Sequence, residues 1–224
     1  MIPLRDSTRS ASVPVVVYSI IAACVGVFLY TFSLGTEEAQ AAFFSGHGAI
    51  PLAVTRGPWP DAWLGLVTSI FMHGSWLHLG GNMLYLWIFG DNVEDAMGHG
   101  RFIVFYLLTG VAAALAHVMA QPASPVPLVG ASGAIAGVLG AYLILYPRAR
   151  ILSLVVFGFF IRLVELPALL VLSLWFLLQL VEGFGTLRAP DVTTVAWWAH
   201  VGGFIAGAAL VLAFARRRST AGFT

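Results

Sequence analysis

Five polar side chains lie inside otherwise apolar stretches of this sequence, and two of them form a pair that could do chemistry. They are His78, Asn82, His117, Ser132 and His200. A serine hydroxyl becomes a nucleophile when an imidazole accepts its proton, which requires the two groups to lie about 2.6 to 3.2 Å apart. Ser132 and His200 are therefore the candidate nucleophile and general base, and the elements that carry them must bring them into contact.

The composition indicates that these stretches lie in a lipid bilayer. Hydrophobic residues make up 59% of the 224 residues and charged residues only 9%, a balance that no soluble domain of this size needs. The basic residues are scattered at segment ends, which argues against a nucleic-acid partner. Cys24 is the only cysteine, so neither an internal disulfide nor a multi-cysteine metal site is expected. We expect no cofactor and no metal.

Six apolar runs are candidate membrane helices, because a hydrocarbon core of about 30 Å needs about 20 apolar residues per crossing. They span 13–34, 75–90, 102–120, 129–146, 166–181 and 195–215. The sequence therefore predicts an all-α polytopic membrane protein, a six-helix bundle with one domain over 1–224 and short cytoplasmic tails.

The residues of two connecting segments predict where each segment lies. The long connection after the first run contains Trp59 and Trp63 among prolines and is expected to lie in the membrane interface. Residues 151–165 contain Arg162 and Glu165, which disfavour a crossing. We expect this segment to be a connector that lies against the membrane.

The arginines predict the orientation, since cytoplasmic loops carry an excess of basic residues. With six crossings both termini share one side, and only Arg56 and Arg188 fall on the other. The termini side carries Arg5, Arg9, Arg101, Arg148, Arg150, Arg162, Arg216, Arg217 and Arg218. We therefore expect cytoplasmic termini in a bacterial inner (plasma) membrane and a site that opens to the extracytoplasmic side.

In this orientation the polar residues lie at similar depths near the extracytoplasmic face of the membrane. At about 1.5 Å per residue, Ser132 lies roughly 6 Å below a helix start near Leu128, and His200 roughly 8 Å below one near Val195. His78 and Asn82 are four residues apart, so they share one face of the second helix. We expect the four side chains to meet in one layer.

Small residues allow the fourth and sixth helices to approach closely. Gly133 and Gly137 form a small-residue face on one helix, and Gly203 and Gly207 form one on the other. Backbone N–H groups at the start of a helix lack intrahelical partners, so those near Ser132 favour an oxyanion there.

Several motifs resemble those of the rhomboid intramembrane serine proteases. They are 130–133 (Gly-Ala-Ser-Gly), 199–203 (Ala-His-Val-Gly-Gly) and 73–82, with a further likeness at 90–102. The order of the motifs also matches, and the resemblance covers nearly the whole chain.

The resemblance implies an endopeptidase that cuts transmembrane proteins with a serine-histidine dyad. Ser132 would be the nucleophile and His200 the general base, while the Ser132 backbone N–H, His78 and Asn82 would stabilise the oxyanion. Gly130, Gly133 and Gly203 would pack the site. The substrate and the oligomeric state are not implied.

Two positions depart from the family pattern. Many rhomboids carry a Trp-Arg pair in the first loop, where residues 62–65 here read Ala-Trp-Leu-Gly. Some members place a tyrosine one turn after the serine, stacked on the histidine, whereas this chain has Ala136. The residue that holds His200 in position is therefore left open.

Other polar residues are expected to be structural. His117 lies near the outer end of the third helix, where an interhelical hydrogen bond is the expected role. His73 precedes the second helix and is expected to brace the loop. Glu94 is expected to tie the cytoplasmic loop to Arg101.

Other functions fit the residues less well. A zinc protease would need a motif such as His-Glu-x-x-His, and no histidine here is followed by glutamate. No paired membrane aspartates are predicted, and Ala134 breaks the Gly-x-Ser-x-Gly motif of soluble hydrolases. A channel or transporter is disfavoured by the lack of an internal repeat. The alternative that remains is a non-catalytic rhomboid-like protein that binds or escorts membrane clients.

Overall fold

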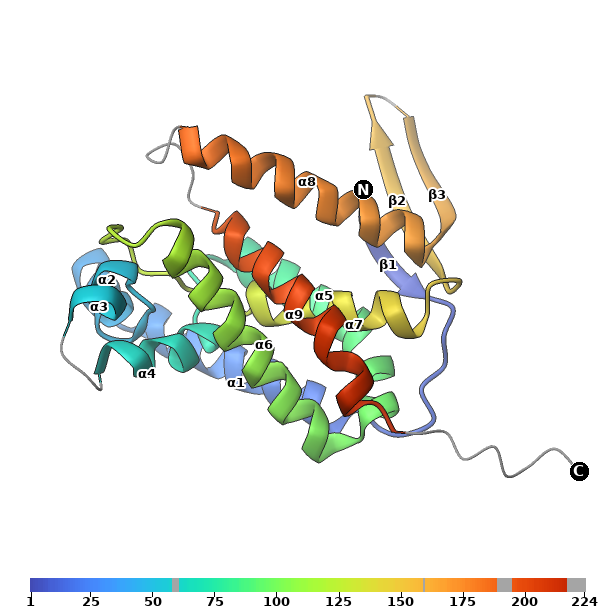
Figure 1. Ribbon diagram of the computed structural model, residues 1–224, viewed down its shortest axis with the longest axis horizontal. Coiled ribbons are helices and arrows are strands. Elements are labelled where there is room, and N and C mark those ends of the chain that lie inside the picture. The colour runs from blue at the N-terminus through green and yellow to red at the C-terminus, as the bar shows by residue number, and fades with distance from the viewer. Residues whose placement is uncertain (58–60, 159, 189–194, 217–224) are drawn as a thin grey trace, which may run out of the picture.

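The computed structural model describes residues 1–57, 61–158, 160–188 and 195–216, and this part of the chain is mostly helical (Figure 1). Of the residues singled out above, Trp59, Arg217 and Arg218 lie outside these ranges. The elements in chain order are β1 (Ile2–Asp6), α1 (Val15–Ser33), α2 (Glu37–His47), α3 (Pro51–Arg56), α4 (Asp61–Thr68), the 3-10 turn η1 (Ser69–Phe71), α5 (Trp76–Met97), α6 (His99–Ala120), α7 (Ser132–Leu145), β2 (Arg150–Phe157), β3 (Phe160–Pro167), α8 (Ala168–Arg188) and α9 (Trp197–Phe214).

Four of the described helices are long and apolar enough to cross a membrane: α1, α6, α8 and α9. Two other predicted spans have different bounds from those expected. α5 continues to Met97 and includes Asp91, Glu94 and Asp95, which the sequence analysis assigned to a loop. α7 has 14 residues, so at about 1.5 Å per residue it is roughly 21 Å long. The apolar helices nevertheless make this a membrane protein.

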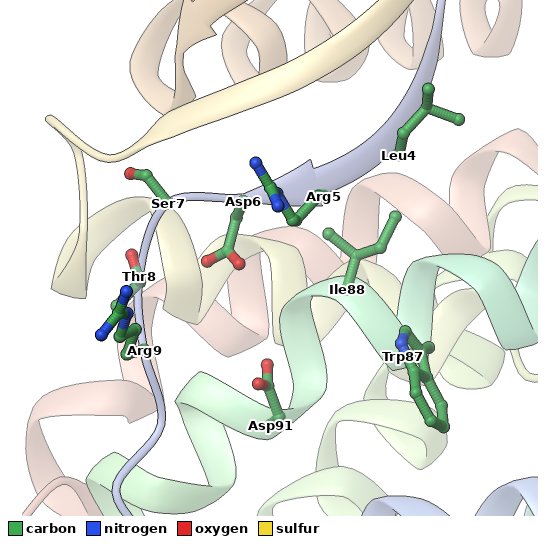
Figure 2. A pocket seen from close by; sticks show the side chains of 9 residues that line it. All are labelled: Leu4, Arg5, Asp6, Ser7, Thr8, Arg9, Trp87, Ile88 and Asp91. Carbon is green, nitrogen blue, oxygen red and sulfur yellow. The ribbon is translucent and has the colours of Figure 1, made fainter.

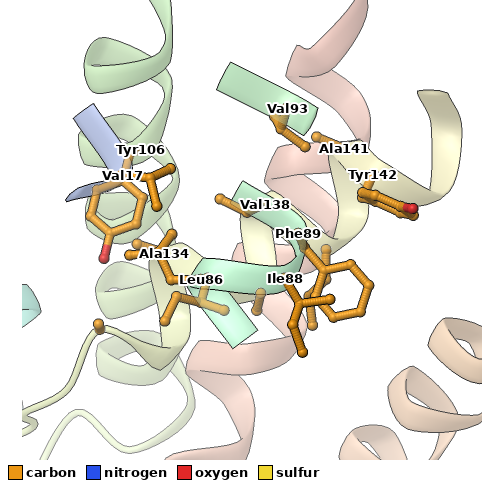
Figure 3. Packing of buried hydrophobic residues seen from close by; sticks show 14 of the residues in the cluster. Val17, Leu86, Ile88, Phe89, Val93, Tyr106, Ala134, Val138, Ala141 and Tyr142 are labelled. Carbon is orange, nitrogen blue, oxygen red and sulfur yellow. The ribbon is translucent and has the colours of Figure 1, made fainter. Parts of the chain in front are cut away.

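The short helix α7 is the centre of the bundle. Its residues from Gly133 to Tyr142 are all buried, and α5, α6, α8 and α9 contact it. A helix that is apolar on every side belongs in the interior of a bundle. Where α5 packs on α7, the ring edge of Phe89 meets Tyr142 with centroids 5.0 Å apart (Figure 3).

The expectation of an all-α chain is wrong, because β1, β2 and β3 form an antiparallel sheet in that order. Residues 151–165, expected to be a connector against the membrane, form most of the hairpin of β2 and β3. The physical reason is local: the two strands are rich in β-branched residues, and Gly158 adopts φ 57° at the turn between them. Ile151 and Ser153 are fully buried while Val156 is exposed, as strand alternation requires.

Glu94 is bonded differently from expectation. Its carboxylate is fully buried and accepts the backbone N–H groups of Val16 at 3.0 Å and Val17 at 2.8 Å, at the start of α1. It also lies 2.5 Å from Nδ1 of His99. The predicted tie to Arg101 is therefore wrong: the carboxylate binds the unpaired N–H groups at the start of α1, and Arg101 donates instead to the carbonyl of Phe214 at 3.5 Å.

The segment that follows β1 and the residue Arg216 after α9 both contact the C-terminal part of α5. The hydroxyl of Ser12 donates to Asp95 at 2.5 Å, and the backbone N–H of Arg216 donates to a carbonyl in the last turn of α5 at 2.9 Å. β1 lies beside the same part of α5, and the two enclose a cavity of about 490 Å³ that is lined by Arg5, Asp91 and their neighbours (Figure 2). We call this region the termini end.

The connection between α1 and α5 folds into α2, α3 and α4, on the side of the bundle away from the sheet (Figure 1). Ala49 exchanges two backbone hydrogen bonds with Leu128, at 2.8 and 3.1 Å. Val54 and Leu66 pack with residues of α6 in a small apolar cluster. This connection therefore anchors the chain just before α7.

Candidate active site

Ser132 is the first residue of α7. The helix begins four residues later than the expected start near Leu128, because the preceding segment is held in extended contacts by Ala49 and η1. Gly130 donates its N–H to the carbonyl of Ser69 at 2.9 Å and adopts φ 130°, which disfavours any residue with a side chain. A Cβ at Gly130 would also lie 2.8 Å from the His78 ring.

His200 lies in the first turn of α9, and its Nε2 is 2.8 Å from Oγ of Ser132. This separation is within the range in which an imidazole can accept a hydroxyl proton. The structure thus brings together the two residues that the sequence analysis paired.

Glycines make this contact possible, because they let α7 and α9 approach backbone to backbone. A Cβ at Gly203 would collide with the carbonyl of Gly133, and one at Gly207 with the carbonyl of Gly137. A Cβ at Gly133 would lie 2.6 Å from Ala113 of α6. The two small-residue faces predicted from the sequence therefore face each other.

The second ring nitrogen of His200 has a partner that the sequence analysis missed. Nδ1 lies 2.7 Å from Oε1 of Gln179, on α8. Trp175, one turn earlier on α8, places its ring centroid 5.9 Å from that of His200 with the planes inclined by 36°. An aromatic ring thus packs against the histidine even though the position one turn after the serine is Ala136.

A cavity of about 250 Å³ joins these groups. Its walls come from four helices: His78 and Asn82 from α5, Ser132 from α7, Trp175 from α8 and His200 from α9. All four of the polar residues that were expected to converge therefore line one cavity. We call this region the site end.

His78 and Asn82 are held on α5 by local contacts. The side-chain amide of Asn82 donates to the backbone carbonyl of His78 at 3.0 Å, and Asn82 is 8% exposed. Within the described residues we find no partner for its second amide hydrogen. The ring of His73 meets that of His78 edge-on with centroids 5.1 Å apart, in keeping with a bracing role for His73.

The start of α7 also presents backbone donors. The first intrahelical bond runs from the N–H of Ile135 to the carbonyl of Ala131, so the N–H groups of Ser132 and Gly133 precede it. Such groups carry the positive end of the helix dipole. An anion beside Ser132 would meet this positive end.

His117 does not join the site. It is buried on α6 and does not line the cavity. Within the described residues its Nδ1 has no hydrogen-bond partner, so the expected interhelical bond is not found at that atom.

The sequence matches the Rhomboid domain family over residues 60–217. The chain belongs to the rhomboid family. The matched region contains α5 to α9 and all the residues that line the 250 Å³ cavity. The rhomboid resemblance inferred from the sequence motifs is therefore confirmed.

Individual rhomboid relatives match shorter parts of the chain. Rhomboid protease GluP of Bacillus subtilis is 34% identical over 150 residues, covering 67% of this chain and 26% of that protein. Rhomboid protein 1, mitochondrial, of Saccharomyces cerevisiae is 38% identical over 96 residues, covering 41% of this chain and 28% of that protein. Putative rhomboid protease YdcA of Bacillus subtilis is 34% identical over 124 residues, covering 50% and 60% of the two chains. This rhomboid thus covers well under two thirds of the length of the first two relatives.

Proposed function

We propose that this rhomboid is an intramembrane serine endopeptidase that hydrolyses peptide bonds in or near transmembrane segments of other membrane proteins. The observation that carries the proposal is the 2.8 Å contact between Oγ of Ser132 and Nε2 of His200, beside a cavity. Names of two similar proteins, GluP and YdcA, include the word protease, which supports it.

In the first half of the reaction Ser132 attacks the scissile carbonyl. Nε2 of His200 takes the hydroxyl proton as the Oγ–C bond forms, and the carbonyl oxygen becomes an oxyanion. His200 then gives that proton to the leaving amine, the C–N bond breaks, and an acyl-enzyme remains.

In the second half water replaces the amine. His200 takes a proton from water, the hydroxide oxygen attacks the ester carbonyl, and the proton passes to Oγ of Ser132 as the ester bond breaks. The carboxyl product leaves and the enzyme is restored. The cavity beside Ser132 gives water a place to reach the ester.

Donors around Ser132 stabilise the oxyanion in both halves. The backbone N–H of Ser132 at the start of α7 is one, and the positive end of the helix dipole adds to it. His78 and the free amide hydrogen of Asn82 supply side-chain donors from α5. Gly130, Gly133 and Gly203 permit the close packing that the site needs.

The proposal includes a topology. α5 and α7 cross the bilayer together with α1, α6, α8 and α9, giving six crossings in one domain over 1–224, and both termini lie in the cytoplasm of a bacterial cell. The site then opens to the extracytoplasmic side of the inner membrane. The nine-to-two distribution of arginines supports this arrangement, as do the contacts of Ser12 and Arg216 with the end of α5 away from the site.

Purified protein in detergent with a single-pass membrane substrate tests the activity. We expect cleavage by the wild type, covalent labelling of Ser132 by a fluorophosphonate, and loss of both in Ser132→Ala. Binding of the substrate with neither cleavage nor labelling would instead support the non-catalytic alternative.

Reporter fusions test the topology independently. Fusions at Arg150 and after Arg216 should report the cytoplasm, and a fusion between α2 and α3 should report the outside. A cytoplasmic signal from the α2–α3 fusion would contradict the proposed orientation.

A further inference from the structure

Gln179 is a buried amide on α8, a helix with one buried and one exposed apolar face. It is 6% exposed, whereas its neighbours Leu177 and Leu178 are 53% and 59% exposed. Burying an amide in an apolar environment is costly unless its hydrogen bonds are made. Oε1 of Gln179 makes one such bond, to Nδ1 of His200 at 2.7 Å. The proposed reaction described above does not use this residue.

The two hydrogen bonds of the His200 ring depend on each other. A neutral imidazole carries one N–H, so only one ring nitrogen is an acceptor. If the carbonyl oxygen of Gln179 accepts from Nδ1–H, Nε2 presents its lone pair to the hydroxyl of Ser132. The opposite tautomer would present an N–H to Ser132 and could not take its proton.

We infer that Gln179 is the positioning residue of this site, holding His200 in the tautomer and orientation in which Nε2 is the base toward Ser132. The inference rests on the proposed function and adds a third group to the pair. Gln179 takes the place that a carboxylate holds in a Ser-His-Asp triad. A neutral amide can orient the ring without the larger desolvation cost of a buried carboxylate.

The structure also explains how α8 presents this amide. Trp175, Gln179 and Gly183 are spaced four residues apart and therefore lie on one face of α8. Trp175 packs near His200, and the indole N–H of Trp198 donates to the carbonyl of Gly183 at 3.1 Å. These contacts fix the rotation of α8 against α9, so Gln179 faces the ring rather than lipid.

Variants at Gln179 test the inference through turnover. Gln179→Met keeps the length of the side chain but removes the acceptor, so kcat should fall roughly 10- to 100-fold, as expected for an unpaired buried donor, with little change in KM. Gln179→Glu keeps an acceptor oxygen and should retain most of the turnover. Trp198→Phe is the matched control, because it removes the other α8–α9 bond without touching His200, and its kcat should stay near the wild-type value.

The ring tautomer gives a readout that does not depend on proteolysis. In protein with ¹⁵N-labelled histidine, with His200 assigned by its loss in His200→Gln, Nδ1 should carry the proton in the wild type and in Gln179→Glu. That preference should be lost in Gln179→Met and kept in Trp198→Phe.

The outcomes separate this inference from the proposed function. An unprotonated Nδ1 in the wild type, or a wild-type kcat in Gln179→Met, overturns the role of Gln179 even if Ser132 proves to be the nucleophile. An equal fall of kcat in Gln179→Met and Trp198→Phe also overturns it, since helix docking would then explain both. A wild type that neither cleaves nor labels rejects the protease, while the tautomer measurement still decides the role of Gln179.

Discussion

At the termini end, one carboxylate oxygen of Asp6 receives hydrogen bonds from the hydroxyl of Tyr142 at 2.5 Å and from the amide of Asn92 at 3.0 Å. At the site end, Asn82 uses its amide for a single bond within its own helix and borders an open cavity. Both ends therefore place polar groups among apolar helices. They differ in where the hydrogen bonds run: those at the termini end join different elements of the fold, whereas the amide of Asn82 bonds only within its own helix.

This difference predicts that substitutions at the two ends affect different properties, stability at one end and turnover at the other. Polar groups at the termini end join β1, α1, α5 and α7, so their loss should weaken the native state and leave turnover per folded molecule unchanged. Groups at the site end leave hydrogen-bonding capacity for a substrate. Their loss should reduce turnover and leave the melting temperature almost unchanged.

The largest effect is expected at the reactive pair. Ser132→Ala and His200→Ala should each abolish cleavage while the protein stays folded, because the nucleophile and its base act as one unit. The double variant should be little worse than either single variant. Kinetics and melting curves on the same preparations check this, and proteolysis surviving in Ser132→Ala would place the nucleophile elsewhere.

Glu94 should show the opposite behaviour. Glu94→Ala leaves the N–H groups of Val16 and Val17 without their carboxylate, so we expect a loss of roughly 2 to 5 kcal/mol in the free energy of unfolding. Glu94→Gln keeps the volume and one acceptor and should lose less. Denaturation in detergent measures both, and a fall in kcat within the folded fraction would contradict the division between the two ends.

A smaller effect is expected for the oxyanion donors. Removing one such donor in a soluble serine protease lowers kcat by about 10² to 10³, but here the Ser132 N–H and the second side chain remain. Asn82→Ala and His78→Ala should therefore each lower kcat by roughly 10- to 100-fold, with a smaller change in KM. A large drop in melting temperature with unchanged kcat would instead assign Asn82 to the fold.

The sequence predicts the site better than it predicts the fold around it. Polar residues in apolar runs stand out because their burial is costly, and glycines four residues apart show which helices can approach. These two signals identify Ser132, His200 and the pairing of α7 with α9. Gln179 is also a polar residue within a predicted span, 166–181, so the cost of its burial could have identified it. The histidines and the serine stand out first because their chemistry is more easily recognised.

The start of α7 and the sheet depend on contacts between distant segments, which local patterns do not show. α7 begins at Ser132 because Leu128 pairs with Ala49 and Gly130 bonds to Ser69. The strand β1 exists because β2 offers it an edge, and Ile2 pairs with Leu154 in that sheet. Only tertiary packing decides these boundaries.

The smallest predicted effect concerns Asp6. It tests whether a charged carboxylate at the termini end lowers the stability of the fold. Burial raises the pKa of Asp6 above its usual value of 3.8, although the bond from Tyr142 works in the opposite direction. The folded protein therefore holds a proton on Asp6 at pH values where the unfolded chain has lost it. Stability contributed by this group is complete below the unfolded pKa and is lost as the pH rises through the folded pKa.

Asp6→Asn removes this titration and keeps a polar side chain of the same size. As the pH rises above about 4, the melting temperature of the wild type should fall relative to that of Asp6→Asn, since only the wild type must ionise the half-buried carboxyl of Asp6. Parallel melting curves of the two proteins report the titration of Asp6 together with its effect on the neighbouring carboxyl of Asp91. Should the difference instead grow in favour of the wild type with rising pH, the bonds from Tyr142 and Asn92 would outweigh burial, and the termini end would gain stability from this charge.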